Sequence, residues 1–266
     1  MPSFTDQLGR TITLHRTPGR VISLVPSQTE LLYDLGANVV GITKFCVHPA
    51  AWFREKPRIG GTKDIHPGKI AALKPDLVIA NKEENDRGQV EALAAQYPVW
   101  VSDIRNLADA LAMIRSIGDI VGRVPKAQSL AADIEKAFND LQPLARPLRT
   151  AYFIWRNPWM STGGDTFIHD MLRRCGFTNL FSAQSRYPIV EPAALTGCDI
   201  VLLSSEPYPF RDKHIAEIQN MLPGVIVRLV DGELFSWYGS RLLQAPDYFR
   251  SLQAGCRLDL RKNNDL

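Results

Sequence analysis

Aromatic and arginine side chains gather just after short apolar runs in both halves of the sequence. Flat aromatic rings suit packing against a large, partly apolar ligand, and arginine guanidinium groups bind carboxylate or phosphate groups. This combination indicates recognition of a bulky organic ligand. Each position taken alone is equally well explained by packing in a protein core. The candidate ligand-binding residues are Phe45, Trp52, Trp155, Arg156, Tyr208, Trp237, Tyr238 and Arg241.

Acidic side chains form a second group. Glu83, Glu84 and Asp86 follow the apolar run 77–80, and Glu206 follows the run 200–203. The two clusters therefore take equivalent places in the two halves of the chain. A solvated loop face explains them as well as a charged contact surface does.

Patterns for other chemistries are weak or missing from the sequence. The run 163–166 lacks the G-x-G-x-x-G and G-x-x-x-x-G-K patterns of phosphate-binding loops, so Asp165 or Thr166 is expected to cap a helix instead. Cys46 and His48 could offer two metal ligands, but no zinc-type spacing and no H-E-x-x-H motif accompany them. Since there is no G-x-S-x-G elbow either, the sequence predicts no catalytic residue and no resident metal.

The elements that must position these side chains alternate between strand and helix, which predicts an α/β fold. Strands are expected at 21–24, 39–42, 77–80, 99–101, 151–155, 200–203 and 225–229. Helices are expected at 28–35, 67–73, 87–96, 166–175, 211–221 and 241–254. Ser27 and Glu30 have the spacing of a capping box at the start of the first helix, and Gly36 is expected to end it.

A long helical region separates the two runs of alternation. Residues 106–144 show helical periodicity with no strand, and Gly122 and Pro125 divide them into two helices. We therefore expect an N-terminal α/β lobe at 1–122, a connecting backbone helix at 123–146 and a C-terminal α/β lobe at 147–266.

The composition is that of an ordinary globular protein. The 266 residues are 45% hydrophobic and 22% charged, and the net charge of +3 with scattered Lys and Arg argues against a nucleic-acid partner. Four cysteines without paired spacing lean toward a reducing compartment. The N-terminal residues have no basic segment followed by an apolar run, so we expect a cytoplasmic chain or one whose leader or lipid anchor is missing.

Several segments resemble one protein family, in the order expected for it. They are RVISLVPSQTELLYDL from Arg20 with the following VVGIT, IGGTKDIHPGKIAALKPDLVIA from Ile59, GGDTFIHDMLRRCGFTNLF from Gly163 and LLSSEPYPF from Leu202. Across residues 20–250 they are similar to the helical-backbone substrate-binding proteins, which supply cobalamin, iron-siderophores or haem to ABC importers.

The resemblance implies a monomer with two Rossmann-like lobes joined by a long α-helix and a ligand cleft between the lobes. The ligand would be a metal complex, so no intrinsic cofactor and no metal bound directly by the protein are expected. In this family one acidic residue on each lobe contacts arginines of the membrane permease. Glu206 is the second-lobe candidate, whereas the first-lobe position falls near Arg87, which leaves Glu83 and Glu84 as neighbouring candidates.

Trp155, Trp237 and Tyr238 favour a corrinoid such as cobalamin, because a macrocycle offers a broad surface for ring contacts. The first alternative is an iron-siderophore or haem, which would use Arg156, Arg241 and Tyr208 as partners for its anionic groups. The second alternative is a leaderless cytosolic carrier, or an enzyme that acts on a corrinoid or an iron chelate. Because the family works outside the cytoplasmic membrane, the resemblance implies a periplasmic location.

Overall fold

The computed structural model describes residues 1–264, which group into two compact units. Unit 1 contains Met1–Ile104, Ala108–Glu135 and Trp237–Arg241, and unit 2 contains Arg105–Leu107, Lys136–Ser236 and the chain from Leu242 onward. The chain therefore enters unit 1 a second time, near its C-terminal end. The lobe boundaries expected from the sequence remain a prediction, and residues 265–266 of the last lobe lie outside the described range.

Unit 1 is built on a four-stranded parallel sheet with the strand order β4-β3-β5-β6. The strands are β3 Val21–Ser23, β4 Val39–Ile42, β5 Leu77–Asn81 and β6 Val99–Ser102. Every residue of β3, β5 and β6 is buried, as expected for parallel strands covered on both faces. These four strands confirm the four expected in the first half of the chain. A separate antiparallel hairpin, which the sequence did not predict, joins β1 Ser3–Thr5 to β2 Thr11–Thr13.

Six helices accompany this part of the chain. They are α1 Pro26–Leu35, α2 Ala50–Glu55, α3 Pro67–Ala72, α4 Arg87–Ala94, α5 Leu107–Ile120 and α6 Val124–Asn139. Helices α5 and α6 confirm the expected division of the long helical region, and Gly122 between them has a positive φ of 66°. The two helices pack closely at Gly118, where an added Cβ would collide with that of Ala127. The short helix α2 was not predicted.

The start of α1 differs from the capping box that the sequence suggested. Pro26 is the first helical residue, and Val25 before it is extended and has no side-chain group that could cap the helix. Ser27 is buried inside the helix, and the Glu30 carboxylate makes an ion pair elsewhere. Proline in the first turn needs no N–H partner and already has a helical φ, which explains the earlier start. Gly36 ends α1 in the left-handed conformation, with φ 76°, as predicted.

Unit 2 contains a second four-stranded parallel sheet, with the order β10-β9-β7-β8. Its strands are β7 Leu148–Phe153, β8 Phe177–Asn179, β9 Ile200–Ser204 and β10 Ile226–Val230. When the strands are numbered along each unit, both sheets have the order 2-1-3-4. The units therefore share one topology although the sequence shows no strong internal repeat. The short edge strand β8 was not predicted, and β7 ends two residues before the expected end at 155.

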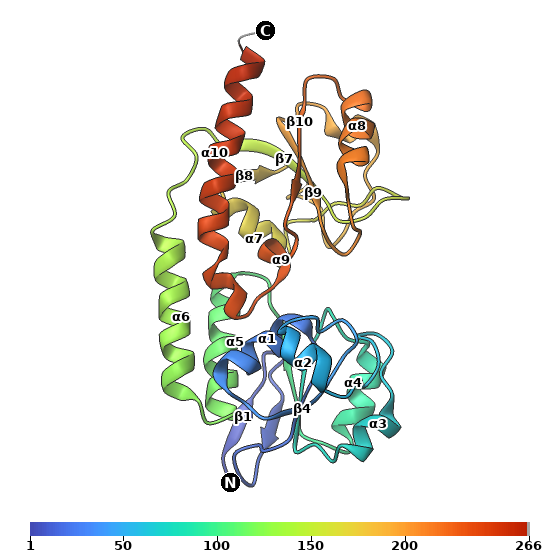
Figure 1. Ribbon diagram of the computed structural model, residues 1–266, viewed down its shortest axis with the longest axis vertical. Coiled ribbons are helices and arrows are strands. Elements are labelled where there is room, and N and C mark those ends of the chain that lie inside the picture. The colour runs from blue at the N-terminus through green and yellow to red at the C-terminus, as the bar shows by residue number, and fades with distance from the viewer. Residues whose placement is uncertain (265–266) are drawn as a thin grey trace. The chain divides into compact units, whose positions relative to one another are not determined.

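The helices of unit 2 cover both faces of this sheet. They are α7 Phe167–Arg174, α8 Asp212–Met221, α9 Glu233–Ser236 and α10 Ala245–Asn264, with a 3-10 turn at Pro192–Leu195. A second 3-10 turn, Ser240–Leu243, begins in the part of the chain that belongs to unit 1. Figure 1 shows α8 on one side of the strands and α7 and α10 on the other. The side chains of β7 alternate accordingly: Phe153 lies in the core cluster with Ile218 of α8, and Tyr152 packs against Phe235 of α9. Thr166 caps α7 by accepting the His169 N–H, as predicted.

The last helix differs from the one expected at 241–254. It begins at Ala245, because the preceding residues 240–243 form a 3-10 turn, and it continues to Asn264. Within residues 1–264, none of the helices is both long enough and apolar enough to span a membrane.

Candidate functional site

The topology of each sheet identifies the edge at which a ligand is expected to bind. In open parallel α/β sheets, ligands bind beyond the carboxyl ends of the strands, at the point where the strand order reverses. In unit 1 this point lies between β3 and β5, and in unit 2 it lies between β7 and β9. The loops that follow β7 and β9 contain Trp155, Arg156 and Tyr208, so the structure brings these predicted residues together in unit 2.

An aromatic cluster occupies this edge of unit 2 and consists of Trp155, Trp159, Tyr208, Phe210 and His214. The Tyr208 ring lies 4.7 Å from that of Phe210 and 5.8 Å from that of Trp155, measured between ring centroids. The Trp159 and Phe210 rings are stacked, with an interplanar angle of 7°. Phe210 and His214 are buried, whereas Trp155 is 41% exposed. The cluster therefore combines a packed base with an exposed indole ring that a ligand can contact.

Arg156, predicted to bind a ligand anion, makes an ion pair within unit 2. Its guanidinium group donates two hydrogen bonds to the carboxylate of Glu217, with Nη2–Oε1 and Nε–Oε2 distances of 2.8 and 3.0 Å. The two side chains are 28% and 31% exposed. The hydrogen bond to Glu217 also raises the pKa of Arg156. This arginine is thus already matched by an internal carboxylate.

The segment Trp237–Arg241 belongs to unit 1, and packs against helix α1. Arg241 Nη2 and Nε lie 2.6 and 2.9 Å from the two carboxylate oxygens of Glu30, and the guanidinium group is 4.9 Å above the Trp237 ring. Ser240 Oγ donates a hydrogen bond to Asp34. Gly239 passes so close to α1 that an added Cβ would lie 2.6 Å from the Ser27 carbonyl oxygen.

These contacts change the interpretation of three predicted ligand residues. Trp237 and Tyr238 are only 7% and 6% exposed, and the Trp237 ring meets His48 edge-on at 5.6 Å. Arg241 is 14% exposed at its side chain and has a carboxylate partner. All three are placed in unit 1, whereas Trp155 is in unit 2. These three side chains are therefore buried mainly by packing within unit 1, which leaves little of their surface for a ligand.

Phe45 and Trp52 lie after β4 in unit 1 and are more accessible. Phe45 is 51% exposed, and the Lys44 ammonium group lies 5.1 Å from its ring centroid. Trp52, in α2, meets the Tyr33 ring edge-on at 5.1 Å and has the Lys56 ammonium group 5.2 Å away. Tyr33, which is 43% exposed, was not singled out from the sequence.

Buried polar side chains hold the carboxyl edge of the unit 1 sheet. Gln28 in α1 and Asn81 at the end of β5 both donate to Ser102 Oγ at the end of β6, at 2.5 and 3.0 Å. Asn81 Oδ1 also accepts the backbone N–H groups of Glu83 and Glu84, at 2.8 and 2.9 Å. The backbone of this acidic loop is therefore fixed, while both glutamate residues stay partly exposed.

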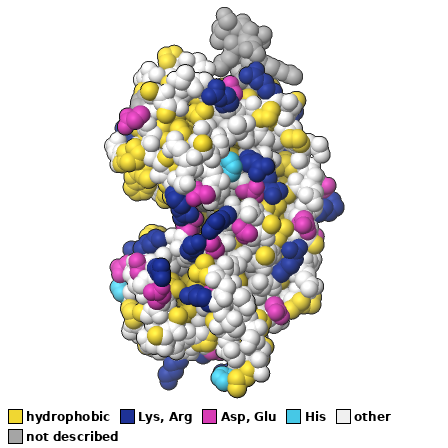
Figure 2. Space-filling view, turned by 180° about the vertical axis from the view of Figure 1, so that it is seen from behind, with side chains coloured by type: hydrophobic (Ala, Val, Ile, Leu, Met, Phe, Trp, Pro, Cys, Tyr) yellow, Lys and Arg dark blue, Asp and Glu magenta, His cyan; other side chains and the backbone are white. Residues whose placement is uncertain are grey.

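Glu206 follows β9 in unit 2, just as Glu83 and Glu84 follow β5 in unit 1. In chain order, β5 and β9 are each the third strand of their sheet. Its carboxylate accepts a hydrogen bond from Ser236 Oγ at the end of α9, at 2.6 Å. Glu206 is thus half-buried and tied to α9. On the face drawn in Figure 2, basic and acidic side chains are interspersed, in keeping with the small net charge.

The Cys46 and His48 pair shows no sign of a metal site. The Cys46 thiol is fully buried, 3.1 Å from the hydroxyl oxygens of both Thr29 and Thr43, and burial raises its pKa. Over the described residues 1–264, no three His, Cys, Asp or Glu side chains come together in a way that could hold a metal ion.

Comparison with known proteins gives the class of the chain. A family model described as periplasmic binding protein matches residues 21–196, and the chain belongs to this family of solute-binding proteins. Membership confirms the resemblance found in the sequence and the prediction of a binding protein rather than an enzyme.

Individual relatives refine this picture. The chain is 29% identical over 181 residues to the ABC transporter substrate-binding lipoprotein YvrC of Bacillus subtilis. The aligned region covers 63% of this chain and 57% of that protein. It is 27% identical over 176 residues to the vitamin B12-binding protein of Pectobacterium atrosepticum, covering 62% and 63%. The match thus spans less than two thirds of either relative. The solved periplasmic haem-binding protein BhuT has the same fold, with a TM-score of 0.78 at 20% identity over 89% of this chain and 98% of that one.

Proposed function

We propose that this chain is the substrate-binding protein of an ABC importer and that its ligand is a corrinoid such as cobalamin. The observation that carries the choice of ligand is the state of the two candidate arginines. Arg156 is paired with Glu217, and Arg241 is paired with Glu30, each through two hydrogen bonds. An anionic siderophore or a haem propionate would have to compete with these carboxylates. The amide side chains of a corrinoid ring are uncharged and can be bound without a cation.

The aromatic side chains supply the complementary apolar surface. Trp155 is the most exposed ring of the aromatic cluster, and Phe45 and Trp52 add accessible rings at the carboxyl edge of the other sheet. Rings of this kind pack edge-on or offset against a macrocycle, and such contacts supply much of the affinity in apolar ligand sites.

The partner of such a protein is an ABC permease, which implies a location outside the cytoplasmic membrane. Glu83 and Glu84 in unit 1 and Glu206 in unit 2 are the proposed contacts with permease arginines, because they occupy matching places after the third strand of each sheet. The hydrogen bond from Ser236 to Glu206 would have to coexist with that contact or be exchanged for it.

A spectral titration with cyanocobalamin tests the proposal, with haem and ferrichrome titrated in parallel. Saturable cobalamin binding with a Kd below about 1 μM supports it. Tight binding of haem or ferrichrome with no response to cobalamin would keep the class of protein and overturn the choice of ligand. Mass spectrometry of the recovered ligand separates capture from catalysis, because an enzyme would return an altered corrinoid.

Trp155 offers the cleanest residue-level test of ligand contact. Its ring is 41% exposed, so replacing it by alanine removes contact surface without opening a buried cavity. Trp155→Ala should weaken cobalamin binding by about 1–3 kcal/mol, measured by titration calorimetry. Leu258→Ala, at an exposed position of α10, is the matched control and should leave the affinity unchanged. Equal affinity of Trp155→Ala and wild type would remove Trp155 from the site.

A further inference from the structure

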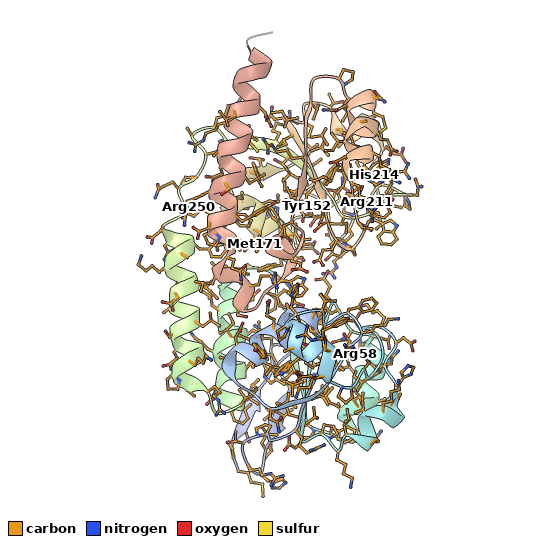
Figure 3. The ribbon with its side chains drawn as sticks, viewed as in Figure 1. Arg58, Tyr152, Met171, Arg211, His214 and Arg250 are labelled. Carbon is orange, nitrogen blue, oxygen red and sulfur yellow. The ribbon has the colours of Figure 1, made fainter. Side chains whose placement is uncertain are left out.

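His214 is a buried histidine in the first turn of α8, and its ring nitrogens have different partners. The backbone N–H of Arg211 donates to Nδ1 at 2.9 Å. The Arg211 carbonyl oxygen is also near Nδ1, at the longer distance of 3.2 Å. A backbone N–H can only donate, so Nδ1 must offer its lone pair, and the single proton of the neutral ring is placed on Nε2. Figure 3 shows Arg211 and His214 beside each other in unit 2.

The Nε2 proton of His214 is directed at Tyr208. The distance from Nε2 to the Tyr208 hydroxyl oxygen is 3.3 Å, and the two rings meet edge-on with centroids 5.5 Å apart. Since Nε2 carries the proton, it donates and the phenol oxygen accepts.

The Tyr208 hydroxyl is thereby left with its own proton to donate. A phenol has one O–H and two lone pairs, and the neighbouring imidazole presents its Nε2–H to the oxygen. In this tautomer, Nε2 of His214 cannot accept the phenol proton. Tyr208 is only half-buried and lies beside the exposed Trp155 ring, so a bound ligand can reach this proton.

We propose that Tyr208 is the hydrogen-bond donor that recognises an acceptor oxygen on the ligand, and that His214 is the positioning residue that directs this donor. The proposal rests on the proposed function for its ligand, where the acceptor is the carbonyl oxygen of a corrinoid side-chain amide. A donor held in this way discriminates against ligands that have an apolar group at that position, because the phenol proton would be left without a partner.

Two substitutions at His214 separate its two nitrogens. His214→Asn places an acceptor near the position of Nδ1 and so keeps the partner of the Arg211 N–H, but it has no group at the position of Nε2. His214→Gln reaches the position of Nε2 and can still donate to Tyr208. We expect Tyr208→Phe and His214→Asn each to weaken cyanocobalamin binding by about 10-fold, and His214→Gln to weaken it by less than about 3-fold.

The double variant Tyr208→Phe/His214→Asn distinguishes positioning from general structural damage. If His214 acts through the Tyr208 hydroxyl, His214→Asn has no further effect on affinity once that hydroxyl is gone. Losses that multiply in the double variant would overturn the positioning role, as would wild-type affinity in Tyr208→Phe. Circular dichroism and thermal unfolding of each variant identify any that fail to fold.

A measurement on the ligand-free protein makes the test independent of the proposed function. Nitrogen-15 NMR of the histidine side chains should show His214 as the Nε2–H tautomer at neutral pH, and a proton on Nδ1 would overturn the argument. If the wild type shows this tautomer but binds no cyanocobalamin, the corrinoid assignment fails while the orientation of Tyr208 stands. If it binds cyanocobalamin and Tyr208→Phe binds equally well, the function stands and this inference fails.

Discussion

Replacing Arg241 by methionine is expected to destabilise unit 1 by about 3 kcal/mol. Methionine keeps the apolar stem over Trp237 but removes both hydrogen bonds to Glu30, whose side chain is only 15% exposed. Breaking a fully buried ion pair costs about 3–5 kcal/mol, whereas an exposed pair contributes about 1 kcal/mol or less. The low exposure of this pair places it near the lower end of the buried range. Loss of the cation–π contact with Trp237 adds up to about 1 kcal/mol.

Two further variants give this estimate an internal standard. Arg156→Met breaks the pair with Glu217, whose side chains are about twice as exposed at 28% and 31%, and should cost about 1 kcal/mol. The double variant Arg241→Met/Glu30→Gln removes the carboxylate that the single change leaves without a cation. Its stability should return to within about 1 kcal/mol of wild type.

Urea unfolding followed by tryptophan fluorescence measures the free energy of unfolding of each variant, and hydrogen exchange in α1 shows whether the loss is local to unit 1. The reasoning would be refuted if Arg241→Met were no less stable than Arg156→Met. A double variant as unstable as Arg241→Met would also contradict it, because the cost would then not come from the carboxylate of Glu30.

Three other expectations follow from the packing and the titrating groups. Gly118→Ala should lower the free energy of unfolding by about 1–3 kcal/mol, because the added Cβ would collide with Ala127. Gly68→Ala is the control: no atom lies within 4 Å of its added Cβ, so it should be neutral or slightly stabilising in the same urea assay. Burial lowers the pKa of His169 below 6.5, so the unfolded chain binds a proton at this residue at a higher pH than the folded chain does. The free energy of unfolding should therefore decrease as the pH is lowered through about 6.5. In the His169→Gln variant, this decrease should be smaller. Burial raises the pKa of Cys256 to about 11, and all four cysteines are buried. A thiol-reactive disulfide reagent at about pH 8 should therefore label the native protein slowly, whereas it should label all four thiols in urea. Rapid labelling of the native protein would contradict the packing.

Seven of the eight strands in the two parallel sheets were predictable, because parallel strands buried on two faces are short, nearly continuous apolar runs. The run 39–42 coincides with β4, and 77–80 lies within β5. The elements that were missed are short pieces such as β8 and α9, whose three or four residues offer no periodicity to detect. The capping box failed because Pro26 competes for the helix start and its fixed φ prevails.

The candidate site was predictable only where it depends on strand ends. Trp155 and Tyr208 follow two strands that the topology makes neighbours, so their meeting follows from the fold class. Arg241 and Glu30, which form an ion pair, are 211 residues apart in the sequence. No local sequence pattern predicts a contact between residues so far apart. His214 was not singled out, because its role depends on which ring nitrogen faces the Arg211 N–H, and this is decided by the geometry of one helical turn.

The return of Trp237–Arg241 to unit 1 has a consequence for biosynthesis. During translation, the residues of α1 leave the ribosome long before the segment that supplies Gly239, Ser240 and Arg241. Until that segment emerges, Glu30 and Asp34 lack the partners that they have in the finished protein. Domains commonly fold as units from the N-terminus as the chain is made. Here unit 1 can only be completed after most of unit 2 has been synthesised, so a nascent chain stalled before residue 237 should carry an unfinished first domain.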